Sequence, residues 1–256
     1  MSGSSSQIKV AIAGTGSYVP ERVLTNSDLE IMVDTSDEWI TTRTGIKERR
    51  IAAEDEFTSH MAVKASMKAI EQAGISPSEV ELIIVATITP NTLTPATACY
   101  VQHELGAHQA VAFDISAACS GFLYAMRLAE RMISGGTCKN ALILGAEKLS
   151  AFVNWDDRST CVLFGDGAGA ALLKRAREEE GQILAIDIGT DGGQTDLLNI
   201  PGGGSACPIT QENADQRLST LAMVGTDVFK QAVTRCLLYT SPSPRDRTRS
   251  RMPSSD

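Results

Sequence analysis

Short apolar runs recur along the chain in the manner of buried strands. The clearest runs from Glu81 to Thr87, and its Leu-Ile-Ile-Val-Ala centre is apolar without a break. A strand has this composition when helices cover both faces of its sheet, because none of its side chains then meets water. Three further runs have the same style and lie at 8–13, 110–115 and 141–145. We therefore predict a largely buried sheet.

Helical patterns alternate with these strands. Apolar residues recur three or four positions apart over 58–73, and the pattern ends at Gly74, a residue typical of a helix end. A second helix is predicted to begin at Thr94-Pro95, where a hydroxyl cap precedes a proline, and to run to about Leu105. This order of strands and helices predicts an α/β layered fold.

The composition is that of a globular protein. Of 256 residues, 43% are hydrophobic and 21% are charged, which suits one large or two modest domains with a buried core. No apolar run approaches the ~20 residues of a membrane span, and the first residues lack the basic and apolar stretches of a secretory signal. We therefore expect a cytoplasmic protein without a membrane segment.

Charge and cysteine content argue against two other classes. The net charge of −8 is unlike that of nucleic-acid-binding proteins, which carry a basic face that neutralises phosphates. The six cysteines include no Cys-x-x-Cys pair and no zinc-ligand spacing. We therefore expect separate reduced thiols, with neither a metal site nor a disulfide framework.

The composition changes after Arg235. Residues 236–256 are rich in Ser, Pro and Arg and contain few apolar side chains to bury, so we expect this tail to be disordered. A basic tail usually indicates anion binding. We interpret this one instead as the product of a truncated or misassembled reading frame.

Cys119 has a setting that the other cysteines lack. It follows the apolar run 110–115, small residues flank it from Ser116 to Gly121, and an almost wholly apolar helical pattern follows as far as Gly135. A thiol at the amino end of a buried helix faces the positive end of the helix dipole, which favours the thiolate. On spacing alone two interpretations stay open, a nucleophile and a buried cysteine in a tight turn.

Two glycine clusters resemble nucleotide-binding loops only in part. Gly14-Thr15-Gly16 follows a strand, but Pro20 prevents a helix from starting beside it. Residues 165–170 fit the pattern Gly-x-Gly-x-x-Ala, yet no clear helix start follows them. We interpret both clusters as tight turns or sites of close packing.

The ordered motifs together resemble β-ketoacyl-[acyl-carrier-protein] synthase III, the condensing-enzyme family that initiates bacterial fatty-acid synthesis. The resemblance covers about residues 8–235, and its most specific part is Asp-Glu-Trp-Ile at 37–40 with Arg-Thr-Gly-Ile at 43–46. The other matching stretches are 14–20, 113–122, Asp157-Arg158 and 164–170. The small-residue turn around Cys119 alone would indicate only a thiolase-like protein.

The resemblance implies that Cys119 is the nucleophile. Its thiolate would attack the thioester of an acyl-CoA, typically acetyl-CoA, and its own backbone N–H would form half of an oxyanion hole. Malonyl-acyl carrier protein would then lose carbon dioxide and condense with the acyl group. Acyl-CoA is implied as a substrate, and no permanently bound cofactor is expected.

The resemblance also implies a coenzyme A site. Trp39 and Arg158 would sandwich the adenine through stacking and cation–π contact, with Thr35 and Arg43 beside them. The residues that match the family's pantetheine and acyl tunnel are Gly225 and Phe229.

The fold implied by the resemblance is the thiolase fold, two similar α/β halves that usually form a homodimer. We expect a complete first half over 1–181 and a truncated second half over 182–235, which opens with a strand at 182–189 and a helix at 219–235. The family's catalytic histidine and asparagine, and a glycine that supplies the second oxyanion donor, have no counterpart in the 256 residues. His108 lies before the nucleophile's strand and is given no catalytic role.

The sequence therefore predicts a fragment of a condensing enzyme that does not turn over and is poorly soluble or partly unfolded by itself. Two alternatives stay open. One is a related thiolase-fold synthase with a different acceptor, and the other is a non-catalytic protein that binds acyl-CoA or dimerises.

Overall fold

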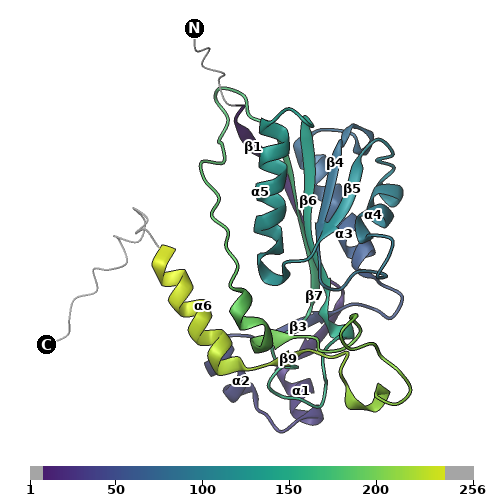
Figure 1. Ribbon diagram of the computed structural model, residues 1–256, viewed down its shortest axis with the longest axis vertical. Helices are drawn as coiled ribbons and strands as arrows, with labels where there is room; N and C mark the ends of the chain where they lie inside the picture. Colours follow the sequence, from purple (N-terminus) through teal and green to yellow (C-terminus); the bar gives the residue numbers. More distant parts are fainter. Residues whose placement is uncertain (1–7, 240–256) are drawn as a thin grey trace, which may run out of the picture. The chain divides into compact units, whose positions relative to one another are not determined.

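The structure is a computed structural model that describes residues 8–239, with side chains as far as residue 233. The chain divides into two compact units between Thr190 and Asp191, and each unit is described by itself (Figure 1). The predicted division into thiolase halves at residue 181 stays a prediction. Of the predicted disordered tail, residues 236–239 are helical instead, and residues 240–256 lie outside the described range.

The first unit alternates strands and helices. Its elements in chain order are β1 (Val10–Tyr18), β2 (Arg22–Thr25), α1 (Asn26–Met32), α2 (Asp37–Thr44), β3 (Glu48–Ile51), α3 (Thr58–Ala73), β4 (Leu82–Ala86), α4 (Thr97–Leu105), β5 (Val111–Ile115), α5 (Gly121–Ser134), β6 (Asn140–Lys148) and β7 (Asp166–Arg175).

A five-stranded sheet forms the centre of this unit, with strand order β1-β7-β6-β4-β5. β4 runs parallel to β5 and β6, whereas β7 runs antiparallel to β6 and β1. Helices α3 and α4 pack on one face and α5 on the other (Figure 1). The predicted α/β layered fold is confirmed.

The position of strand β4 between two helical layers explains why its sequence is apolar throughout. Ile83 and Val85 face the core under α3 and α4, whereas Leu82 and Ile84 face the core under α5. Successive side chains of a strand point to opposite faces, so a strand covered on both sides buries all of them. The four side chains are at most 1% exposed.

Gly14 and Gly16 let α3 lie directly against β1. A Cβ at Gly14 would overlap the carbonyl oxygen of Ala69, and a Cβ at Gly16 would overlap that of Ala65. Both glycines lie inside β1, which continues to Tyr18 instead of ending near residue 13 as predicted. Close packing against the helix backbone, and not a turn, explains this cluster.

The second glycine cluster, residues 165–170, opens strand β7. The strand continues to Arg175 and pairs with β6 and β1 along its length. This stretch therefore lacks the strand–turn–helix form of a dinucleotide-binding loop.

Helix α4 begins later than predicted, at Thr97 instead of Pro95. Its amino end is capped from the neighbouring strand, because the carboxylate of Asp114 accepts hydrogen bonds from the N–H groups of Thr97 and Ala98 at 2.6 and 2.8 Å. A carboxylate in this position satisfies free N–H groups and complements the helix dipole. The predicted end at Leu105 is confirmed.

A small two-stranded sheet carries α1 and α2. Strands β2 and β3 pair antiparallel, and Thr25 at the end of one lies opposite Glu48 at the start of the other. The N–H of Asn26 donates to the carbonyl of Lys47 at 3.2 Å and closes the base of the intervening segment. The two helices therefore lie in a segment whose two ends are adjacent, at the paired ends of β2 and β3.

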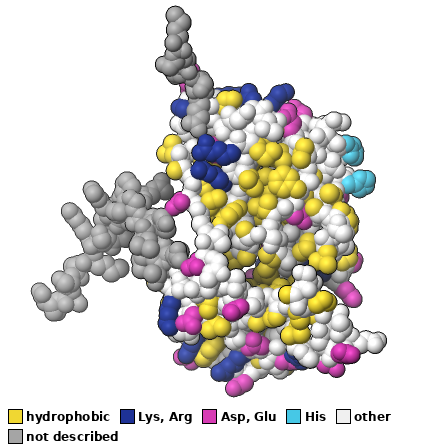
Figure 2. Space-filling view, viewed as in Figure 1, with side chains coloured by type: hydrophobic (Ala, Val, Ile, Leu, Met, Phe, Trp, Pro, Cys, Tyr) yellow, Lys and Arg dark blue, Asp and Glu magenta, His cyan; other side chains and the backbone are white. Residues whose placement is uncertain are grey.

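Helix α5 is amphipathic, whereas the sequence predicted burial all round. Leu123 and Leu128 remain 47% and 43% exposed, because a helix presents only one side to a single sheet. Figure 2 shows hydrophobic side chains gathered on the face of the molecule that carries α5. The residues of α5 that are buried are Gly121, Ala125, Ala129 and Ile133.

The last residues of the first unit differ from prediction. Residues 182–189 form no strand; in this stretch the N–H of Ile183 donates to the carbonyl of Val10 at 2.8 Å. A single hydrogen bond of this kind is not the ladder that defines a strand.

The second unit contains little regular structure. The helix predicted over 219–235 spans 225–239, because residues 222–223 instead pair with residues 198–199. Within 8–239, every helix is too short or too polar to cross a membrane. The elements of the second unit are β8 (Leu198–Asn199), β9 (Ala222–Met223), α6 (Gly225–Tyr239) and 3₁₀ turns at Gly192–Leu197 and Ala214–Gln216.

Candidate functional site

Cys119 lies in a tight connection between strand β5 and helix α5. The strand ends at Ile115, a 3₁₀ turn spans Ala118–Ser120, and the helix begins at Gly121. Ala118 has a φ of 45°, in the left-handed region that residues with a Cβ rarely occupy. Strained conformations of this kind cluster at functional sites, where the surrounding structure enforces them. The turn thus presents Cys119 beside the amino end of α5.

Gly121 allows α5 to start directly over the sheet. A Cβ at this position would lie 2.9 Å from the Cβ of Ala86 at the end of β4, closer than two carbon atoms approach without repulsion. The helix enters the core at Gly121, whereas Cys119 stays outside it and is exposed. Of the two interpretations left open by the sequence, the buried cysteine is wrong.

The described cysteines differ in their environment. Cys138 and Cys161 are buried, and burial raises the pKa of both thiols, which disfavours the reactive thiolate. Cys99 on α4 is exposed, as Cys119 is. Exposure therefore does not single out Cys119, and Cys99 is the matched control for its reactivity.

Three residues of the predicted coenzyme A site lie together. The guanidinium carbon of Arg43 is 4.5 Å from the ring centroid of Trp39, and that of Arg158 is 5.5 Å from the same centroid. Both distances are within the range of cation–π contact. Trp39 and Arg43 come from α2, whereas Arg158 comes from the turn before β7, so the fold joins two segments far apart in sequence.

Arg158 is oriented by Asp34. Its Nη1 donates to the carbonyl of Asp34 at 2.7 Å and lies 3.5 Å from the carboxylate. Both side chains are more than half exposed, and such ion pairs contribute little. An adenine between Trp39 and Arg158 needs a gap of about 7 Å, two van der Waals contacts, so a weakly held arginine suits a site that must widen.

Thr35 supplies a polar group beside this cluster. Its hydroxyl is buried and has no hydrogen-bond partner in the described part of the chain. A buried unsatisfied polar group costs about 1–3 kcal/mol, and in native proteins such a group often meets a water or ligand. The next residue, Ser36, caps α2 by accepting from the N–H of Trp39 at 3.1 Å.

Gly225 and Phe229 belong to the second unit. Gly225 begins α6, and the side chain of Phe229 is 68% exposed. Their predicted place in a pantetheine and acyl tunnel stays a prediction.

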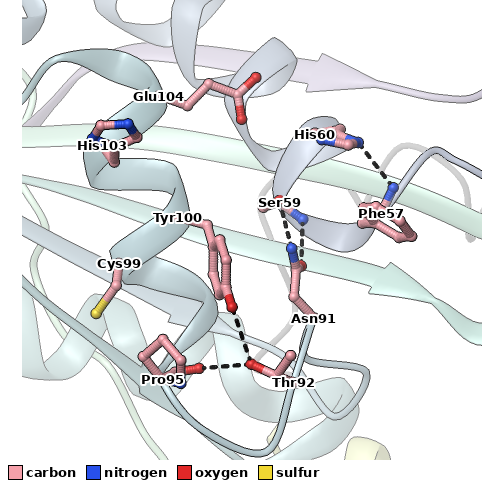
Figure 3. A pocket seen from close by; sticks show the side chains of 10 residues that line it. All are labelled: Phe57, Ser59, His60, Asn91, Thr92, Pro95, Cys99, Tyr100, His103 and Glu104. Atoms are coloured by element: carbon pink, nitrogen blue, oxygen red, sulfur yellow. Dashed lines mark hydrogen bonds between the residues drawn. The ribbon is translucent and has the colours of Figure 1, made fainter.

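A groove of about 900 Å³ lies between the start of α3 and helix α4 (Figure 3). Its polar groups are largely occupied, since the side-chain amide of Asn91 accepts from the Ser59 N–H at 3.0 Å and donates to the Ser59 hydroxyl at 2.8 Å. No group of His, Cys, Asp or Glu within the described residues could hold a metal ion. The residues that line the groove are Phe57, Ser59, His60, Asn91, Thr92, Pro95, Cys99, Tyr100, His103 and Glu104.

Sequence reasoning does not identify the residues that contact the predicted adenine site from behind. The contact of Asp34 with Arg158 has no sequence signal, because an aspartate between helices is usually an ordinary surface charge. Asn26 and Arg49 are buried at 2% and 4% exposure. A signal for Arg49 did exist, since Ile51 lies two positions further along the same strand and side chains two apart share a face.

Comparison with known proteins adds independent information. The sequence pattern of 3-oxoacyl-[acyl-carrier-protein (ACP)] synthase III matches residues 113–192. The β-ketoacyl-[acyl-carrier-protein] synthase III of Desulfitobacterium hafniense is 52% identical over 226 residues, which are 88% of this chain and 68% of the relative. The enzyme of that name from Caldanaerobacter subterraneus is 53% identical over 227 residues, 89% of this chain and 68% of the relative.

Solved structures agree with these relatives. The 3-oxoacyl-[acyl-carrier-protein] synthase III of Aquifex aeolicus superposes with a TM-score of 0.77 at 51% identity, over 86% of this chain and 66% of that one. The corresponding protein of Pseudomonas aeruginosa gives a TM-score of 0.79 at 41% identity, over 88% and 67%. The predicted thiolase-like fold is confirmed. The chain therefore belongs to the β-ketoacyl-[acyl-carrier-protein] synthase III family, the condensing acyltransferases that initiate fatty-acid synthesis.

Proposed function

We propose that Cys119 accepts an acyl group from acyl-CoA, acetyl-CoA being the expected donor. The observation that carries this proposal is the exposed thiol behind a left-handed Ala118 at the amino end of α5. The helix dipole and the free N–H groups of the first turn favour negative charge at this position. A thiolate held there is a competent nucleophile toward a thioester.

The proposed step is a thioester exchange. The Cys119 sulfur bonds to the acyl carbonyl carbon, the bond from that carbon to the coenzyme A sulfur breaks, and the proton lost by Cys119 balances the one that coenzyme A takes up. The backbone N–H of Cys119 would stabilise the oxyanion that forms in between. The proposal for these 256 residues covers this first step.

Trp39, Arg158, Arg43 and Thr35 are proposed to bind the adenosine end of coenzyme A. The proximity of two guanidinium groups to one indole supports this assignment, because arginine stacks on aromatic rings and also binds phosphate. Thr35 adds a buried hydroxyl that has no hydrogen-bond partner among the residues that the structure describes.

The remaining parts of the proposal concern the complete protein. Malonyl-acyl carrier protein is the proposed acceptor, since the relatives carry the acyl carrier protein in their names. A homodimer, a cytoplasmic location and the absence of a permanent cofactor stay predictions.

Intact-mass measurement after incubation with acetyl-CoA tests the proposal. We expect one acetyl adduct on the unaltered chain, retained in Cys99→Ala and lost in Cys119→Ala. An adduct that survives Cys119→Ala would overturn the assignment of the nucleophile. Coenzyme A binding without any adduct would favour a non-catalytic acyl-CoA-binding protein.

A further inference from the structure

We propose that Arg49 is a positioning residue for the adenine site. From a buried position it sets the spacing between the helix that carries Trp39 and the turn that carries Arg158. This inference rests on the proposed coenzyme A site and adds to it a residue that would not touch the ligand.

Arg49 is 4% exposed on strand β3. Its Nε donates to the carbonyl of Val162 at 3.1 Å, its Nη2 donates to the same oxygen, and its Nη1 donates to the side-chain oxygen of Asn26. These partners are neutral oxygens. A buried cation without them would pay a large desolvation cost, so the guanidinium group holds both partners firmly.

Asn26 connects Arg49 to helix α2. Its Nδ2 donates to the carboxylate of Asp37 at 2.6 Å and to the carbonyl of Ile46 at 2.9 Å. Asp37 is the first residue of α2, and Ile46 follows the end of that helix. Asn26 therefore donates hydrogen bonds to residues at both ends of the helix that carries Trp39.

Val162 connects Arg49 to the turn that carries Arg158. In that turn the carbonyl of Asp157 accepts from the N–H groups of Thr160 and Cys161 at 3.1 and 3.0 Å. Arg158 and Val162 thus lie in one hydrogen-bonded segment. A displacement of the Val162 carbonyl would move the base of the Arg158 side chain.

Arg49 is better suited to this role than the exposed contacts of the site. The pair between Arg158 and Asp34 is exposed to water, which screens it and leaves it weak. The planar fork of donors on Arg49 reaches two oxygens in fixed directions, which the single ammonium of lysine cannot reproduce.

The test compares Arg49→Lys with Arg50→Lys in the full chain. Arg50 is the next residue of β3, and its exposed side chain pairs with Glu48 at 3.3 Å. Titration calorimetry with adenosine 3′,5′-bisphosphate, the adenine end of coenzyme A, measures the dissociation constant. We expect Arg49→Lys to weaken binding about tenfold, the loss of one charge-assisted hydrogen bond, and Arg50→Lys to leave it unchanged.

A second readout separates positioning from general disruption. The alkylation rate of Cys119 by iodoacetamide should be the same in Arg49→Lys and the unaltered chain. Binding within twofold of the unaltered chain, or equal losses in binding and alkylation, would overturn the inference. If Arg49→Lys does not fold, the Asn26→Asp variant tests the inference instead. This variant keeps a side-chain oxygen that accepts from Arg49 but loses the amide group that donates to both ends of α2. That variant should also bind about tenfold more weakly, and unchanged binding would refute the inference.

Failure of the proposed coenzyme A site has a different signature. If the unaltered chain does not bind the bisphosphate, or if Trp39→Ala binds it equally well, the site itself is wrong and the role of Arg49 falls with it. If Trp39→Ala abolishes binding and Arg49→Lys does not weaken it, the site stands and only the present inference is refuted.

Discussion

The two faces of the central sheet are packed to different degrees. Under α3 and α4, the helix side chains of Met61, Ala65 and Ala69 are fully buried, with exposures of 0%. Under α5, Ala125, Ala129 and Ile133 are likewise 0% exposed, so the two faces differ in how closely the helix backbone approaches the sheet and not in whether side chains are buried. Backbone-to-backbone contact of α3 with β1 has no equivalent in the described packing of α5 beyond its first residue, Gly121.

This difference places the closest packing and the candidate nucleophile on opposite faces of the sheet. The face under α3 carries no residue of the candidate site, whereas the helix on the other face begins directly after Cys119. A thiol that must meet a large substrate cannot be sealed in a close-packed core. We therefore expect the α3 face to dominate the free energy of unfolding and the α5 face to tolerate change.

The largest effect is expected where α3 touches β1. Gly16→Ala introduces a Cβ that overlaps the backbone of Ala65, so helix and strand must separate. We expect a loss of about 3 kcal/mol in the free energy of unfolding, measured by urea denaturation. Gly169→Ala in the paired strand β7 is the control, since its Cβ would meet no atom within 4 Å. Equal effects of the two substitutions would contradict the packing argument.

A smaller, pH-dependent effect is expected at the carboxyl end of β6. The carboxylate of Glu147 accepts from the Ile88 N–H at 2.9 Å and from the hydroxyls of Thr87 and Thr89 at 3.2 and 2.5 Å. Burial raises the pKa of this carboxyl above its ordinary 4.5, although the hydrogen bonds oppose the shift. The folded state therefore keeps the proton to higher pH than the unfolded state.

The sign of the effect follows from proton linkage. Where the folded state binds more protons, the free energy of unfolding falls as pH rises. The contribution of Glu147 to stability is therefore lost progressively between the carboxyl pKa of the unfolded chain and the higher pKa of the folded chain. Glu147→Gln removes this titration. Its stability relative to the unaltered chain should rise as the pH increases above the ordinary carboxyl pKa of 4.5, as measured by urea denaturation at each pH. A difference that stays constant with pH would refute the prediction.

The smallest effect is expected on the outer side of α5. Leu128 is 43% exposed, so Leu128→Ala should change the free energy of unfolding by about 0.5 kcal/mol or less. Ile133→Ala on the same helix removes a fully buried side chain and should cost several times more. A loss at Leu128 as large as that at Ile133 would show that the outer side of α5 is covered in solution.

Much of this architecture could be predicted from local sequence. β4 has an unbroken apolar run because both of its faces are covered, and α3 follows its apolar period and ends at Gly74 as predicted. The turn at Cys119 could also be predicted, because its small residues separate a strand from a helix. These features depend on neighbours along the chain.

The rest depends on contacts between distant residues. The start of α4 is set by Asp114, which lies on another strand. Arg49 carries a charge that usually indicates a surface position, yet Asn26 and the Val162 carbonyl compensate its burial. No local pattern contains such partners, so the sequence could not predict which residues support the proposed adenine site.

The segment between β2 and β3 has a consequence for protein engineering. Because Thr25 and Glu48 lie opposite each other, the segment between them is a cassette with adjacent ends, and exchanging it would add little loop-closure entropy to the rest of the fold. Trp39 and Arg43 of the proposed adenine site would move with this segment, whereas Arg158 would stay in the scaffold. The graft must keep an amide at position 26, since the buried guanidinium of Arg49 stays behind in the scaffold.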